Sequence, residues 1–80
     1  MYLAIKDVKV IGDYNLMLTF ENGEKRKLYM LPYLDKGIFQ ELKDISVFKT
    51  VRISFDTIEW ANEADLDPEF LYKYSEKIIE

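Results

Sequence analysis

The first thirty residues alternate apolar and polar side chains, a pattern typical of β-strands with one buried face. In residues 2–10 the parity of the apolar positions changes across Lys6-Asp7, which predicts a strand with a bulge or break there. Residues 14–20 alternate without interruption, and Leu28 and Met30 share one face of the segment that follows. We therefore expect three antiparallel strands joined as a meander.

The turn between the second and third of these strands follows from the register. A two-residue loop at Asn22-Gly23 would turn Leu28 to the wrong face of the sheet. A three-residue loop that begins at Glu21 instead pairs Leu16 with Leu28 and keeps both in the core. We predict a type I turn closed by Gly23 in the left-handed conformation, as a G1 bulge.

Helical and strand signals alternate along the next thirty residues. Pro32 ends the third strand, residues 38–42 have the spacing of a short helix, and Asp44 is placed to cap another helical turn. Residues 51–60 alternate again, and a tight connection at Asp56-Thr57 returns the chain along the same face. These signals predict a short helix followed by a second hairpin.

The last helix has a clear start. Asp67 is a good N-cap, Pro68 suits the first helical position, and Glu69 lies near the positive end of the helix dipole. The apolar stripe of this helix comprises Phe70, Leu71, Tyr74 and Ile78. The order of elements predicts one domain over residues 1–80 with an α+β fold. In it an antiparallel sheet, a three-stranded meander plus a hairpin, packs with a short helix and a C-terminal helix.

The composition removes most enzyme chemistry. The chain has no Cys and no His, which excludes disulfides, thiolate nucleophiles and the commonest metal ligand and general base. The hydroxyls of Ser46, Ser54 and Ser75 have no imidazole to activate them. We expect no catalytic residues, no metal site and no cofactor, and a carboxylate-based metal enzyme stays open only as a third hypothesis.

The sequence also lacks the patterns of export and membrane segments. Its longest apolar runs are a few residues, and its first residues lack the charged-then-apolar order of a secretory signal. We expect a cytoplasmic protein with no membrane partner.

Charge is unevenly distributed along the chain. The net charge is −4, but residues 31–80 hold 11 anions against 6 cations, a balance of −5. Every charged residue between Arg52 and Lys73 is acidic, and such a segment repels phosphate backbones and favours basic partners. We predict a partner-binding surface made of these acidic residues and two aromatic ones, namely Asp56, Glu59, Trp60, Glu63, Asp65, Asp67, Glu69 and Tyr72.

Each of these features also has a plain structural explanation. Trp60 fits a core position against the last helix, because a binding role requires its ring edge to be exposed beside Asp65. Asp65 and Asp67 lack the downstream Gly and Glu of a calcium loop, so that capping and solvation explain them better than a bound cation. The run Lys25-Arg26-Lys27 is compatible with nucleic acid, although a solvated edge that discourages aggregation is the commoner explanation.

An ordered set of motifs resembles a known family, the bacterial domain-of-unknown-function 2442 family. These motifs are Phe20-x-Asn22-Gly23, Pro32-x-Leu34, Phe39-x-x-Leu42-x-Asp44-x-x-x-Phe48, Ile58-x-Trp60 and Asp65-Leu66-x-Pro68-Glu69-x-Leu71-Tyr72. Together they cover nearly the whole chain. The chain departs from the pattern at Tyr29, where many relatives have an aspartate, and at Ala61 and Glu63, where they have a Pro and a Gly around the turn after the tryptophan.

The resemblance implies a genetic context rather than an activity. It implies small bacterial or phage-borne proteins, often encoded beside a short protein of the domain-of-unknown-function 4160 type in a toxin–antitoxin-type pair. Some relatives carry the domain fused to a helix-turn-helix. These contexts lead to two functional hypotheses.

The first hypothesis is a non-catalytic protein-binding domain, antitoxin-like, whose acidic surface engages a basic protein that is encoded next to it. The alternative is a regulatory domain that senses a ligand or assists DNA binding, as in the fused relatives. This chain carries no helix-turn-helix, so we expect no direct contact with nucleic acid. A homodimer through the edge of the three-stranded sheet is a further expectation, because an unpaired strand edge is adhesive.

Overall fold

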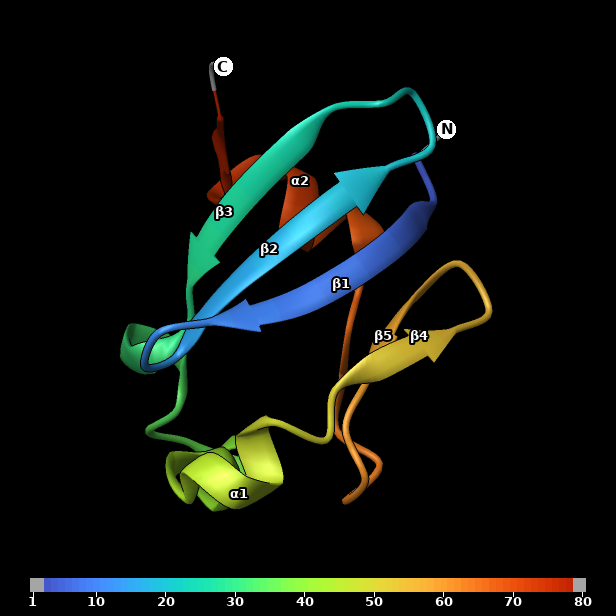
Figure 1. Cartoon of the computed structure of the whole chain (residues 1–80). Coiled ribbons are helices and arrows are strands. Elements are labelled where there is room, and N and C mark those ends of the chain that lie inside the picture. Colours follow the sequence, from blue (N-terminus) through green and yellow to red (C-terminus); the bar gives the residue numbers. More distant parts are fainter. Residues whose placement is uncertain (1–2, 79–80) are drawn as a thin grey trace.

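In a computed structural model, the chain folds into two antiparallel sheets connected by short helices (Figure 1). The structure describes residues 3–78. The strands are β1 (Ile5–Ile11), β2 (Asn15–Phe20), β3 (Lys25–Tyr29), β4 (Arg52–Ser54), β5 (Thr57–Glu59), β6 (Asp65–Leu66) and β7 (Glu76–Lys77). The helices are the 3-10 helices η1 (Leu31–Tyr33) and η2 (Gly37–Lys43) and the α-helices α1 (Ile45–Phe48) and α2 (Pro68–Tyr74). The predicted α+β class is confirmed, and residue 2 of the first predicted strand lies outside the described residues.

The meander has the predicted register. β1 pairs with β2 and β2 with β3, Leu16 lies opposite Leu28, and the β1–β2 register shifts between Ile5 and Asp7, where the sequence predicts a bulge. Gly23 has a φ of +88°, and its N–H donates to the carbonyl oxygen of Phe20 at 2.9 Å. The three-residue loop closed by a left-handed glycine is therefore confirmed, because only this turn keeps the apolar positions of both strands on one face.

The meander has a fourth strand that the sequence analysis missed. β7 pairs antiparallel with β3 at Arg26 and Lys27, and the N–H of Ile78 donates to the carbonyl oxygen of Lys25 at 2.8 Å. The order of the sheet is β1-β2-β3-β7, so that β3 is covered along these residues and is not an edge strand there. The sheet-edge dimer stays a prediction, but this part of β3 does not supply the unpaired edge.

The predicted short helix is the 3-10 helix η2. Residues three apart share a face in a 3-10 helix, so Phe39 and Leu42 lie together and Leu42 is fully buried. Ile38 belongs to another face and is 41% exposed, so the predicted helical spacing over residues 38–42 does not bury all of its apolar positions. The predicted cap at Asp44 is confirmed, because its carboxylate accepts a hydrogen bond from the N–H of Ser46 at the start of α1.

The second hairpin turns one residue earlier than the sequence predicts. Ser54 pairs with Thr57, which leaves a two-residue loop at Phe55-Asp56 instead of Asp56-Thr57. Phe55 adopts a φ of +54° and its side chain is 98% exposed, although the alternation placed it on the buried face of β4. β6 then pairs with β5 and makes a second, three-stranded sheet, β4-β5-β6.

The start of α2 is as predicted, and its end is not. The carboxylate of Asp67 accepts a hydrogen bond from the N–H of Glu69 at 2.9 Å, with Pro68 in the first turn. The helix ends at Tyr74, so Ile78 lies beyond it and is not part of the stripe. Within the stripe Leu71 is fully buried, while Tyr74 is 47% exposed.

The core lies between the two sheets and the helices. Figure 1 shows α2 behind the first sheet and α1 beside the hairpin of β4 and β5. The core cluster includes Leu16, Leu18 and Phe20 of β2 in the first sheet, together with Ile58 of β5 and Trp60 just after it. None of the helices within residues 3–78 has the length and apolar character needed to cross a bilayer.

Candidate functional site

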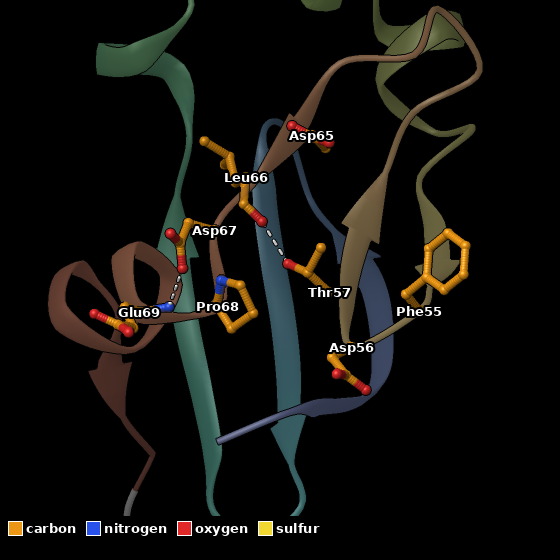
Figure 2. A pocket seen from close by; sticks show the side chains of 8 residues that line it. All are labelled: Phe55, Asp56, Thr57, Asp65, Leu66, Asp67, Pro68 and Glu69. Carbon is orange, nitrogen blue, oxygen red and sulfur yellow. Dashed lines mark hydrogen bonds between the residues drawn. The ribbon is translucent and has the colours of Figure 1, made fainter. Parts of the chain in front are cut away.

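Four of the predicted acidic residues line one cavity of about 450 Å³ (Figure 2). They come from three elements: the tip of the second hairpin, strand β6 and the start of helix α2. We call this cavity the acidic groove, and its lining residues are Phe55, Asp56, Thr57, Asp65, Leu66, Asp67, Pro68 and Glu69. Four of the eight predicted residues therefore lie together, around a groove between these elements.

The groove forms because β6 pairs with β5. Asp65 lies opposite Glu59, and Leu66 opposite Ile58, in this short antiparallel ladder. The hydroxyl of Thr57 also donates to the carbonyl oxygen of Leu66, as the dashed line in Figure 2 shows. The chain between the two strands thus folds back, and it brings carboxylates that are about ten residues apart in the sequence to one place.

The groove combines anionic rims with apolar walls. Asp56, Asp65, Asp67 and Glu69 are exposed, and no lysine or arginine is among the residues that line the cavity. Asp67 also serves as the α2 cap, so one of its carboxylate oxygens is already engaged by a backbone N–H. Such a surface is suited to hold cationic groups that arrive from outside.

The groove carboxylates are not gathered into a cluster of metal-ligating groups. Within residues 3–78 there is no group of three or more acidic side chains arranged to hold a metal ion. The capping role of Asp67 is confirmed by its hydrogen bond to the N–H of Glu69. The carboxylates are therefore arranged along a surface rather than around a point.

Two of the predicted acidic residues lie outside the groove lining. Glu59 forms an ion pair with Arg52 across the hairpin, with 2.9 Å between Oε1 and Nη2, which partly neutralises it. Glu63 is exposed in the turn after Trp60, with a φ of +72°, in the left-handed region that favours glycine. Neither residue adds to the lining of the groove.

Trp60 is a core residue, and its assignment to the partner-binding surface is wrong. Its side chain is 0% exposed, so the ring edge that a binding role requires is not accessible beside Asp65. The ring lies against Phe48 of α1 and Phe39 of η2, with centroid distances of 6.0 and 6.5 Å. Its Nε1–H donates to the carbonyl oxygen of Phe48 at 2.9 Å, which satisfies the only polar group of the side chain.

Tyr72 also lies away from the groove, and its assignment to that surface is corrected. Its hydroxyl donates to Oε2 of Glu24 at 2.7 Å, and its ring packs edge-on against Phe20 at 5.2 Å. The guanidinium of Arg26 lies over the same ring, 4.2 Å from the centroid. Because α2 turns this side chain toward β3, it is tied to the first sheet rather than presented beside the acidic segment.

These contacts belong to a polar cluster that the sequence analysis missed. The Arg26 side chain donates from Nε to Oγ of Ser75 at 2.7 Å and from Nη2 to the carbonyl oxygen of Ser75 at 2.8 Å, and it pairs with Glu24 at 3.2 Å. The Arg26 and Glu24 side chains are only 13% and 15% exposed. We call this the Arg26 cluster; it comprises Glu24, Arg26, Tyr72 and Ser75.

A signal for the Arg26 cluster was present in the predicted register. Arg26 pairs with the buried Leu18, which places its side chain on the inner face of the sheet. Its neighbours Lys25 and Lys27 lie on the outer face and are exposed. The run of three basic residues is therefore split between two faces and is not one continuous basic patch.

The Arg26 cluster perturbs two titratable groups in opposite directions. Hydrogen bonds from Asn22 and Tyr72, helped by the charges of Lys77 and Arg26, hold the pKa of Glu24 below its ordinary value of 4.5. The hydrogen bond to Glu24 raises the pKa of Tyr72 above 10.0, since it favours the protonated phenol, and desolvation acts the same way. The cluster thus favours an ionised Glu24 and a neutral Tyr72.

We expect Glu24 to contribute to acid sensitivity. Because its pKa is lowered on folding, its stabilising contribution is present above pH 4.5 and is lost as the pH falls through the pKa of the folded state. Glu24→Gln should therefore flatten the decline of unfolding free energy below pH 4.5, measured by urea denaturation at a series of pH values. Tyr72→Phe removes one donor and should flatten it partly, whereas identical curves for Glu24→Gln and wild type would contradict the assignment.

Comparison with known proteins gives a family and no activity. A family model described as protein of unknown function (DUF2442) matches residues 5–77, which is nearly the whole chain. Among curated proteins and among solved structures, the comparisons found no match. The function therefore has to be argued from the surface that the fold builds.

Proposed function

The chain belongs to the DUF2442 family, and from its surface chemistry we propose that it is a non-catalytic protein-binding domain whose acidic groove receives a basic protein. One observation carries this proposal. Asp56, Asp65, Asp67 and Glu69 line a single groove whose lining contains no cation. Such a concentration of one charge selects partners by sign and accelerates their approach.

The walls of the groove suit the side chains of lysine and arginine. Leu66 and Pro68 add apolar surface to a lining that also holds the four carboxylates. Lysine and arginine place a long aliphatic stem on apolar surface while their charged head binds a carboxylate. The same carboxylates repel phosphate, so the groove favours a basic protein over a nucleic acid.

We further propose that this basic protein is encoded next to the chain, in an antitoxin-like pair. The support is the charge of the groove, together with the gene context that the resemblance implies. In such a pair the acidic domain would bind its partner reversibly and use no chemistry of its own. The partner should carry lysine and arginine on the surface that enters the groove.

The proposal is tested by copurification and by a matched set of charge variants. The product of the adjacent gene should copurify with the tagged chain at low and moderate salt. Removing three groove charges by Asp56→Asn, Asp65→Asn and Glu69→Gln should weaken the complex about tenfold in calorimetry at about 0.1 M salt. The capping residue Asp67 is left intact, because its loss would disturb α2 itself.

A control set removes the same charge elsewhere. Asp7→Asn, Asp13→Asn and Glu21→Gln change three exposed carboxylates outside the groove lining and should alter the affinity less than about threefold. Equal effects of the two sets would mean that net charge, not the groove, attracts the partner. Absence of any complex at both salt concentrations would contradict the proposed function.

A further inference from the structure

Phe55 is the most exposed large apolar side chain within residues 3–78. Its side chain is 98% exposed, whereas the other exposed large apolar residues range from 36% to 48%. It occupies the two-residue turn between β4 and β5, at the tip of the hairpin that forms one side of the acidic groove. Figure 2 shows its ring at the edge of the groove, pointing away from Asp67 and Glu69.

The fold of the free chain does not require a phenylalanine at this position. An aromatic side chain that is 98% exposed buries almost no area against the core. Its φ of +54° lies in the left-handed region, where two-residue hairpin turns favour glycine, asparagine or aspartate. Phe55 therefore lowers the stability of the free chain relative to glycine or asparagine at this position, and its apolar surface is available to a partner.

We propose that Phe55 is the hydrophobic anchor of the interface, inserted into an apolar pocket of a partner protein whose rim carries lysine and arginine. This inference rests on the proposed function. It adds an apolar pocket to the basic surface that the groove requires of its partner. Aromatic side chains that become fully buried at the centre of an interface commonly contribute most of its affinity. Charged pairs around them contribute mainly specificity and rate of association.

Charge complementarity favours a basic protein over the other surfaces that could cover an exposed phenylalanine. Asp56 follows Phe55 directly, and Asp65 and Glu69 line the groove that Phe55 borders, so a partner surface that covers both the ring and the groove meets carboxylates. An anionic lipid surface would be repelled by these groups, and so would a nucleic acid. A protein pocket with a basic rim satisfies both the ring and the carboxylates.

The test uses two synthetic peptides with equal numbers of lysines. Oligolysine offers charge alone, and a helical lysine–leucine peptide offers the same charge with an apolar face. The wild-type chain should bind both in calorimetry, and it should bind the lysine–leucine peptide about tenfold more tightly, because only that peptide covers Phe55. Phe55→Asn, which fits a left-handed turn position, should abolish this tenfold preference, so that the variant binds the two peptides with equal affinity.

Two controls separate the anchor from folding and from general stickiness. Phe55→Asn should melt at the wild-type temperature or above it, because asparagine adopts a positive φ more readily than phenylalanine. Tyr29→Ala changes another exposed aromatic residue, which does not line the groove, and should leave both affinities unchanged. A preference lost equally in Tyr29→Ala would overturn the proposal.

The remaining outcomes distinguish this inference from the proposed function. If both peptides bind but Phe55→Asn keeps the tenfold preference, the anchor is wrong and the groove stands. If neither peptide binds, the proposed function fails and the anchor fails with it. Phe55-dependent binding to phosphatidylglycerol vesicles, without peptide binding, would overturn the proposal in favour of a membrane contact.

Discussion

Replacing Trp60 with alanine should lower the free energy of unfolding by about 3–5 kcal/mol, the range measured when large aromatic side chains are removed from cores. The side chain is 0% exposed and lies between Phe39 and Phe48, so its removal leaves a cavity that rigid neighbours cannot fill. Urea denaturation followed by far-ultraviolet circular dichroism measures the effect. Tryptophan fluorescence is unsuitable, because Trp60 is the only tryptophan in the chain.

Trp60→Phe keeps an aromatic ring in the core and removes the hydrogen bond together with part of the indole volume. This variant keeps an aromatic ring but removes the Nε1–H that donates to the carbonyl oxygen of Phe48. The loss should be about 1–3 kcal/mol, the cost of leaving a buried acceptor unsatisfied. A Trp60→Ala variant within about 1 kcal/mol of wild type would contradict the core role, since an exposed tryptophan would produce that result.

Arg26→Ala should lower the free energy of unfolding by about 2–3 kcal/mol, because it removes both guanidinium hydrogen bonds to the buried Ser75 and one of the partners of Glu24. The guanidinium contacts both of these residues and also lies over the ring of Tyr72. It therefore joins β3 to the end of α2 through three different contacts. Chemical denaturation of the wild type and the variant at neutral pH measures the difference.

Two further variants on the same strand serve as controls for Arg26→Ala. Arg26→Lys keeps the charge but loses the planar fork that donates simultaneously to Glu24 and Ser75, so it should recover less than half of the stability. Lys27→Ala changes an exposed cation next to it and should alter the unfolding free energy by less than about 0.5 kcal/mol. An Arg26→Ala effect no larger than that of Lys27→Ala would show that the cluster is not structural.

The structural roles of Trp60 and Tyr72 also decide which residues are suitable for binding experiments. Trp60 and Tyr72 are committed to packing and to the Arg26 cluster, so variants of either residue would confuse unfolding with loss of binding. Changing the groove carboxylates other than Asp67 leaves the α2 cap intact, because Asp67 makes that contact. The partner should therefore be sought with the groove variants and with Phe55→Asn.

Parts of the structure that depend on a few neighbouring residues were predictable. Asp44 and Asp67 cap their helices because the N–H groups that they bind lie two residues away in the sequence. The turn at Gly23 followed from the parity of the apolar positions in two adjacent strands. In each case the information that selects the conformation lies within a short segment.

Other parts were mispredicted because their causes lie far away along the chain. β6 and β7 are two residues long, too short to show any alternation, and they are strands only because β5 and β3 lie beside them. The alternation of residues 51–60 predicted a buried Phe55. In the structure Ser54 pairs with Thr57, and this pairing places Phe55 in the turn. The sequence analysis treated Arg26 as one of three surface cations, because its hydrogen-bond partner Ser75 lies far away along the chain.

The acidic segment shows where local information ends and tertiary information begins. Its composition alone established one sign of charge between Arg52 and Lys73 and the absence of His and Cys. The fold then selected four of its carboxylates for one groove, paired Glu59 with Arg52 and buried Trp60. The reason is physical: charge is a property of each residue, whereas a shared surface needs the β5–β6 pairing that brings separate residues together.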